Sequence, residues 1–146
     1  MREKHGIWST RPTLDLIASF SNETLAGHLG IEFVEIGDDF IRARMPVDAR
    51  THQVFGILHG GASATLAETL GSIGGAFCVD VETKHVVGLE LNCNHVRAVR
   101  EGFVYGTARP LHLGGRTQIW DIRIVDDQEK LVCVSRLTVA VLENRG

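Results

Sequence analysis

The stretch HGGASATLAETLGSIGGAFCVD, residues 59–80, decides the fold. Large apolar residues recur in it every three or four positions, the period of a helix face; they are Leu66, Leu70, Ile73 and Phe77. Alanines and glycines fill most of the positions between them. Because glycine inside a helix costs about 1 kcal/mol relative to alanine, these glycines indicate that other elements pack closely against the segment. The pattern predicts one long helix that is buried on more than one side.

One carboxylate, Glu68, lies in the middle of this apolar segment. No lysine or arginine occurs in residues 59–81, so Glu68 has no ion-pair partner on its own helix. Burial of an uncompensated carboxylate is costly. Glu68 therefore either points to solvent at the rim of the helix or lies in a cleft as a general base or nucleophile. Ser72 follows one turn later, where its hydroxyl can orient the carboxylate or hold a water.

The residues before the helix combine short helical segments with a hairpin. Residues 13–28 read as helical, with Leu14, Ile17 and Leu25 expected against the core and with Ser21 or Asn22 expected to start the second segment. An extended region from Ile31 and a strand over residues 40–45 follow, separated by the turn Gly37-Asp38-Asp39. This order of turn residues between two apolar runs predicts a β-hairpin.

The residues after the helix read as four strands. Alternation of apolar and polar residues places them at 84–97, 102–111, 117–125 and 131–142, with turn residues between them. Strands joined by short turns, without crossover helices, are antiparallel. The fold class is therefore α+β, with a sheet of about six strands wrapped around one long helix.

Length and composition narrow the functional classes. The chain has 146 residues, which predicts a single domain over residues 1–146, and its net charge of −3 does not favour nucleic-acid binding. No apolar run is long enough to span a membrane, and residues 1–12 lack the apolar core of a secretory signal. The three cysteines, Cys78, Cys93 and Cys133, are odd in number and form no CxxC pair, which favours reduced thiols in a cytoplasmic protein.

Two familiar site chemistries do not fit the sequence. The seven histidines are scattered and show no metal-ligand spacing with cysteine or carboxylates, so no metal site is predicted. A Ser/His/Asp hydrolase is disfavoured too, because the segment around Ser63 lacks the second glycine of a GxSxG elbow.

Four segments carry a resemblance to a known family. They are IGDDFIRARMPVDARTHQVFGILHGGASATLAETLGS (36–72), VVGLELNCNHVRAVREG (86–102), PLHLGGRTQIWDI (110–122) and SRLT (135–138). In combination they resemble the hot-dog-fold acyl-CoA thioesterases, in the branch of the Arthrobacter-type 4-hydroxybenzoyl-CoA thioesterases that includes bacterial enzymes of menaquinone and enterobactin synthesis. The resemblance covers nearly the whole chain and implies a hot-dog fold, a homodimer and a dimer of dimers.

The resemblance also implies an activity and its residues. The substrate would be an acyl-CoA or acyl-carrier-protein thioester with an aromatic or medium-chain acyl group. Glu68 would attack the thioester carbon or activate a water, and the backbone N–H of Gly60 would polarise the carbonyl. Gln53 and His59 would position the carbonyl and the water, and Ser72 would help to hold that water. From the residues alone, His59 is equally a helix cap.

A second set of residues would bind coenzyme A, which is part of the substrate, so no separate cofactor is expected. By the resemblance the set is Gly88, His95, Val96, Arg97 and Ala98, and the turn residues His112, Leu113, Gly114, Gly115, Arg116 and Thr117. A glycine turn flanked by histidine and arginine suits a phosphate. The alternative is that Arg97 and Arg116 are solvated strand ends.

Two other functions stay open at this point. A hot-dog hydratase or dehydratase acting on acyl thioesters also uses a histidine and an acidic residue, and a non-catalytic domain could bind acyl-CoA as a sensor. The acyl preference depends on which of the nearby apolar side chains line the site; the candidates are Phe20, Phe55, Ile73, Phe77 and Val86.

Overall fold

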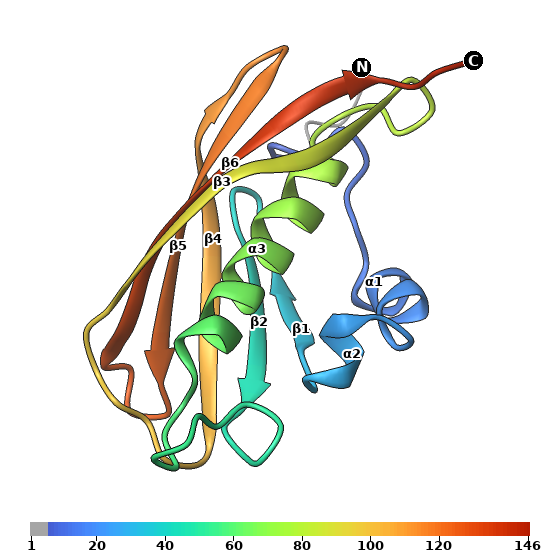
Figure 1. Ribbon diagram of the computed structural model, residues 1–146. Coiled ribbons are helices and arrows are strands. Elements are labelled where there is room, and N and C mark those ends of the chain that lie inside the picture. The colour runs from blue at the N-terminus through green and yellow to red at the C-terminus, as the bar shows by residue number, and fades with distance from the viewer. Residues whose placement is uncertain (1–5) are drawn as a thin grey trace.

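The computed structural model describes residues 6–146 (Figure 1). Residues 1–5, which belong to the segment in which no secretory signal is predicted, lie outside the described residues. In chain order the elements are α1 (Leu14–Ser21), α2 (Leu25–His28), β1 (Glu32–Ile36), β2 (Ile41–Pro46), α3 (Gly60–Phe77), β3 (Lys84–His95), β4 (Phe103–Leu113), β5 (Thr117–Asp126) and β6 (Leu131–Glu143).

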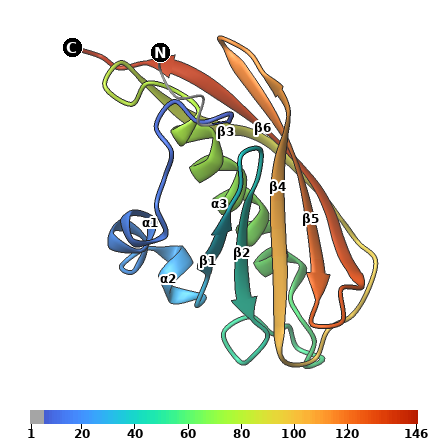
Figure 2. The same cartoon turned by 180° about the vertical axis from the view of Figure 1, so that it is seen from behind.

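The described strands form one antiparallel sheet in the order β1-β2-β4-β5-β6-β3. The sheet curves around α3, which lies along its concave face (Figures 1 and 2). The hairpin of β1 and β2 is one edge of the sheet, and β3, which directly follows α3, is the other. The predicted α+β class, with six strands around one long helix, is confirmed.

The glycines of α3 bring the helix close to the sheet. A Cβ atom on Gly71 would lie 2.6 Å from Leu137 Cδ2 on β6, and one on Gly74 would lie 3.0 Å from Trp120 Cη2 on β5. Leu66, between these glycines and the start of the helix, is fully buried. Close packing on the sheet side is therefore confirmed, and these positions exclude a side chain because the sheet occupies its place.

The opposite side of α3 is less covered than predicted. Gly61 and Glu68 are exposed, and Ala64, Thr65 and Ser72 are only half-buried. Burial of the helix on more than one side is therefore wrong for the single chain. The small residues on this side leave a flat strip of helix surface beside β3.

A buried polar contact fixes the C-terminal end of α3. The indole N–H of Trp120 donates to Gln118 Oε1 at 3.0 Å, and Gln118 Nε2 donates to the carbonyl of Gly75 at 3.3 Å. The helix ends at Phe77 and not at Asp80 as the sequence pattern suggested. Asp80 instead accepts a hydrogen bond from the N–H of Glu82 in the following turn, at 3.1 Å.

The N-terminal helices differ from the sequence expectation in two ways. Thr24, and not Ser21 or Asn22, precedes the first residue of α2. Of the three residues expected against the core, only Ile17 is buried, whereas Leu14 is 39% and Leu25 is 61% exposed. The reason is that α1 and α2 pack on the margin of the core, so that only one side of each short helix meets it.

The three cysteines form no disulfide bond. All three cysteines are free, and burial raises the pKa of the Cys78 and Cys133 thiols to about 12, so both are protonated at neutral pH and poor nucleophiles.

Within residues 6–146 no helix has the length and apolar character needed to cross a membrane.

We expect Gly74→Ala to destabilise the fold. The added Cβ meets the rigid ring of Trp120 at 3.0 Å, and overpacking of this kind costs about 1–3 kcal/mol, more than the roughly 1 kcal/mol that alanine gains in helix propensity. Gly115→Ala is the matched control, because a Cβ there meets no atom within 4 Å. Urea unfolding should show a lower midpoint for Gly74→Ala only; equal midpoints for the two variants and the wild type would contradict the packing described.

Candidate active site

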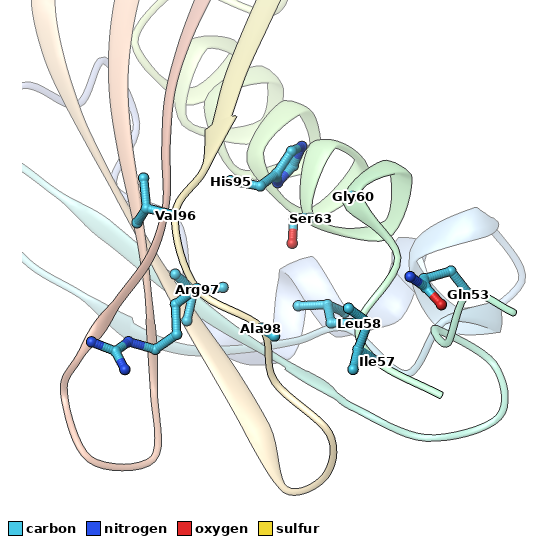
Figure 3. Close-up of a pocket in the computed structure, with 10 residues that line it drawn as sticks. Gln53, Ile57, Leu58, Gly60, Ser63, His95, Val96, Arg97 and Ala98 are labelled. Carbon is cyan, nitrogen blue, oxygen red and sulfur yellow. The ribbon is translucent and has the colours of Figure 1, made fainter. Parts of the chain in front are cut away.

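A hollow lies at the start of α3, and we call it the N-terminal hollow (Figure 3). It is formed by the loop before the helix, the first turn of the helix and the chain that follows β3. Its lining residues are Gln53, Ile57, Leu58, Gly60, Ser63, His95, Val96, Arg97, Ala98 and Val132. Six of these, from three separate parts of the sequence, belong to the predicted site: Gln53, Gly60, His95, Val96, Arg97 and Ala98.

Backbone hydrogen bonds fix the loop that carries Gln53. The N–H of Gln53 donates to the carbonyl of Ile57 at 2.8 Å, and its side-chain oxygen accepts from the N–H of Phe55. Gly56 closes the turn with a φ of +74°, in the left-handed region that glycine adopts readily. The N–H of Leu58 then donates to the carbonyl of Val99 at 2.8 Å, which ties the loop to the segment after β3.

The first residues of α3 form the floor of the N-terminal hollow. His59 is the N-cap, and its Nδ1 accepts from the N–H of Gly61 at 2.8 Å. The N–H of Gly60 finds no acceptor among residues 6–146, as expected for the first turn of a helix. This N–H points out of the positive end of the helix dipole, where a developing negative charge is stabilised.

His95 lies directly against this helix start. A Cβ on Gly60 would be only 2.9 Å from His95 Nε2, so the missing side chain lets the imidazole ring lie against the helix start. Arg97 lies on the outer side of the same hollow, with its guanidinium directed away from the helix (Figure 3). The predicted coenzyme A segment and the predicted carbonyl-polarising residue therefore share one hollow.

Glu68 lies in a different place, which we call the Glu68 hollow. This hollow lies between α3 and the α1–α2 segment and is lined by Phe20, Ser21, Thr24, Leu25, Ala26, Glu68, Thr69, Ser72 and Ile73. The carboxylate is exposed, and within the described residues it forms no ion pair. A Cβ on Gly88 would lie 2.5 Å from Glu68 Oε1, so the bare backbone of β3 leaves room for the carboxylate.

A single chain does not unite the predicted catalytic residues. Glu68 follows Gly60 by eight residues along α3, a separation of about 12 Å at the helical rise. Ser72 lies beside Glu68 as predicted, whereas Gln53 and His59 lie with Gly60. One thioester cannot contact both groups of residues within one chain.

The turn from His112 to Thr117 lies at the other end of the molecule. It closes through the hydrogen bond from Gly114 N–H to the Thr117 carbonyl, 2.9 Å, and leads into Gln118, which contacts Gly75 near the end of α3. This contact is about 22 Å along the helix from Gly60. The structure therefore does not bring the turn to the N-terminal hollow of its own chain.

The structure also identifies lining residues that sequence reasoning missed. In the N-terminal hollow they are Ile57, Leu58, Ser63 and Val132, and in the Glu68 hollow they are Ser21, Thr24, Leu25, Ala26 and Thr69. Ser63 could have been found from its helical spacing to Gly60. The others depend on long-range packing. Of the five candidates for the acyl pocket, Phe20 and Ile73 line the Glu68 hollow, Phe77 and Val86 pack against the core, and Phe55 is 81% exposed.

The fold and these two hollows define a class of enzyme. An unpaired N–H at a helix start can hold a developing oxyanion, and a lone carboxylate can act as a base or nucleophile toward an acyl carbonyl. Within the described residues no group of three or more histidine, cysteine or carboxylate side chains is placed to hold a metal ion. The arrangement is that of a hydrolase acting on an acyl carbonyl.

Comparison with known proteins gives the family. Residues 55–133 match the model of the thioesterase superfamily. The chain is 52% identical over 136 residues to the 1,4-dihydroxy-2-naphthoyl-CoA hydrolase of Escherichia coli, covering 93% of this chain and 99% of that protein. It is 51% identical over 136 residues to the proofreading thioesterase EntH of Cronobacter turicensis, covering 93% and 98%.

A solved structure agrees with the sequence relatives. The crystal structure of a Pseudomonas aeruginosa thioesterase, in a glutamine-to-alanine variant, superposes with a TM-score of 0.94 at 45% identity and covers 95% of this chain and all of that one. The chain belongs to the thioesterase superfamily and has its hot-dog fold. It is an enzyme that hydrolyses thioesters.

We expect Gly88→Ala to lower the rate of thioester hydrolysis at least about 10-fold with little change in thermal stability. The new Cβ would lie 2.5 Å from Glu68 Oε1 and displace the carboxylate, and small misplacements of a catalytic group can cost about 100-fold in rate. Val87→Ala, at the neighbouring position on the opposite face of β3, is the control and should stay within about threefold of the wild type. A wild-type turnover number for Gly88→Ala would show that the position of Glu68 is unimportant.

Proposed function

We propose that the enzyme hydrolyses acyl-CoA thioesters in two equivalent sites, each shared between two protomers. The observation that carries the proposal is the separation of Glu68 from the Gly60 N–H by about 12 Å along one helix. The N-terminal hollow holds the Gly60 N–H and the Glu68 hollow holds the carboxylate, and the proposed reaction needs both. A second copy of the chain supplies the missing half if the two α3 helices lie antiparallel with Glu68 opposite the partner's Gly60.

The edge of the sheet supports this pairing. β3 is the last strand of the sheet and has no neighbour on its outer side among the described residues. It is twelve residues long and carries Leu89, which is 61% exposed. A long edge strand has unpaired backbone N–H and C=O groups with which another sheet can pair. Antiparallel pairing with the partner's β3 is an isologous contact with two-fold symmetry.

The surface of α3 supports the same arrangement. Ala64 lies midway between Gly60 and Glu68 and is half-buried. A two-fold axis near Ala64 places each Glu68 opposite the other chain's Gly60, and the small side chains on this strip let the helices approach closely. Two such dimers would form the full assembly that the family resemblance implies.

The proposed reaction uses the residues of both halves. The thioester carbonyl accepts a hydrogen bond from the partner's Gly60 N–H. Glu68 either takes a proton from the attacking water or attacks the carbonyl carbon itself, and a water then cleaves the resulting anhydride. In the first route the oxygen of water enters the acid product. In the second route it enters either the acid or the Glu68 carboxylate, depending on which carbonyl of the anhydride the water attacks. In both routes the carbon–sulfur bond breaks and a proton reaches the thiol. Ser72 lies beside Glu68, where it can hold the water.

The substrate class is supported by the relatives and by the charges near the N-terminal hollow. The relative from Escherichia coli is named for an aromatic acyl-CoA. Arg97 lies at the outer side of the hollow and His95 at its floor, where they can meet the phosphates and the pantetheine arm of coenzyme A. Coenzyme A is then part of the substrate, and no further cofactor is proposed. An acyl-carrier protein would present the same thioester on the same arm.

The proposed location is the cytoplasm. All three cysteines are free thiols, as is usual in a reducing compartment such as the cytoplasm. The proposed acyl-CoA substrate would be hydrolysed in that same compartment.

The test is thiol release from benzoyl-, 1,4-dihydroxy-2-naphthoyl-, hexanoyl- and palmitoyl-CoA by the wild type and by Glu68→Ala. We expect the turnover number of the variant to fall by at least about 100-fold, because loss of a general base or nucleophile costs about 100- to 10,000-fold or more in rate. Glu23→Gln, an exposed carboxylate between α1 and α2, is the control and should keep full activity.

Three outcomes would contradict the proposal. Full activity of Glu68→Ala would exclude the carboxylate. Binding of acyl-CoA without thiol release would favour a sensor. Addition of water to an enoyl thioester, with the thioester bond kept, would favour a hydratase.

A further inference from the structure

Ser63, in the second turn of α3, is a buried residue whose hydroxyl has no partner in the described part of the chain. The residue is 1% exposed, yet its oxygen forms no hydrogen bond there. Two other helical hydroxyls each bond to the carbonyl one turn earlier: Ser21 to Ile17 at 2.7 Å, and Thr65 to Gly61 at 2.9 Å. A buried hydroxyl without a partner is costly, so Ser63 indicates a partner from outside the chain.

The free hydroxyl faces the N-terminal hollow. Ser63 lines that hollow, and its oxygen points from α3 into it (Figure 3). The carbonyl one turn earlier, of His59, already accepts from the N–H groups of Ala62 and Ser63, at 3.0 and 3.3 Å. Among the described residues no fully covered side-chain oxygen or nitrogen lacks a partner. The Ser63 oxygen therefore keeps its small exposed area toward the hollow, where a ligand can reach it.

The rest of the hollow suits a neutral ligand with one polar group. Its volume is about 400 Å³, within the range of about 300–1,000 Å³ typical of small-molecule sites. The Arg97 guanidinium is directed away from the helix (Figure 3), and the Gln53 side-chain oxygen already accepts from the N–H of Phe55. Ser63 carries the only hydroxyl of the lining. Most of the other lining side chains are apolar: Ile57, Leu58, Val96, Ala98 and Val132.

We propose that Ser63 hydrogen-bonds the first amide group of the pantetheine arm and so positions the thioester at Gly60. The inference rests on the proposed function, in which the carbonyl accepts from the Gly60 N–H and the partner's Glu68 attacks it. The acyl group then extends toward that carboxylate, and the sulfur with its arm extends into the N-terminal hollow. Two carbon atoms separate the sulfur from the first amide, so an extended arm carries this amide about one helical turn from the carbonyl.

The spacing along α3 matches that span. Ser63 follows Gly60 by three residues, so the two lie on the same side of the helix, about 4.5 Å apart along its axis. A hydroxyl both donates and accepts, and can therefore bond either the N–H or the carbonyl of an amide. Two anchors one turn apart fix the direction of the arm. The carbonyl carbon is thereby held in place for attack, which is how positioning accelerates a reaction.

The test uses two benzoyl thioesters whose thiol chains have equal length. S-benzoyl-N-acetylcysteamine keeps the first amide of the arm, and S-pentyl thiobenzoate replaces it with carbon. We expect Ser63→Ala to lower kcat/KM for the first about 3- to 10-fold, the usual cost of one neutral hydrogen bond, and to leave the second within about twofold. The ratio of the two kcat/KM values therefore falls. Ser63→Cys, which keeps the shape but bonds weakly, should lower the same ratio.

Ser135→Ala is the matched control. Ser135 lies on β6, is also 1% exposed and lines neither hollow. Its replacement removes a buried hydroxyl without touching the proposed site, so the ratio should stay at the wild-type value. Thermal unfolding of each variant checks that the fold is kept.

The outcomes separate this inference from the proposed function. An unchanged ratio in Ser63→Ala and Ser63→Cys, with Glu68→Ala inactive, would overturn the role of Ser63 and leave the proposed function in place. An equal loss on both thioesters would make Ser63 a structural residue and would also overturn the inference. A wild type that releases no thiol from the N-acetylcysteamine thioester or from any acyl-CoA would overturn both proposals.

Discussion

The close approach of α3 to the concave face of the sheet is the contact on which the rest of the structure depends. At Gly71 and Gly74 the sheet side chains Leu137 and Trp120 occupy the space where a Cβ would stand. Helix and sheet are therefore locked in one register. In this register the start of the helix, at Gly60, lies against His95 at the end of β3. Glu68 lies against the backbone of Gly88 on the same strand.

The same contact divides the helix surface between two tasks. The side of the helix with the large apolar residues is buried against the sheet. The side that remains outside the core carries small and polar residues. These include the Gly60 N–H and Glu68, which are about 12 Å apart along the helix, too far for one thioester group to contact both within a single chain. In the proposed shared site, the outer side of the helix would form half of an active site, and this would account for its combination of alanine and serine with a lone glutamate.

Much of the fold follows from periodicity alone. The long helix, except for its last three predicted residues, and the strands were predictable because the period of the apolar residues in a long segment shows which side is buried. Glu68 was recognisable as a candidate site residue because it is a single carboxylate in an apolar helix and has no basic partner on that helix. The boundaries of α2 and the exposure of Leu14 and Leu25 were not predictable, because the orientation of very short helices is decided by tertiary contacts and not by their own sequence. The contact of His95 with Gly60 likewise depends on the packing of distant segments.

The shared site is tested most directly by mixing two inactive variants. Glu68→Ala and Gln53→Ala each damage a different half of the site. Dimers that carry one subunit of each kind, purified through two different tags, hold one site with both halves intact and one with neither. If the site is shared, these mixed dimers should release thiol at about half of the wild-type rate. If each chain formed a complete site by itself, every site would carry one defect, and the mixed dimers would be as inactive as the two parent variants.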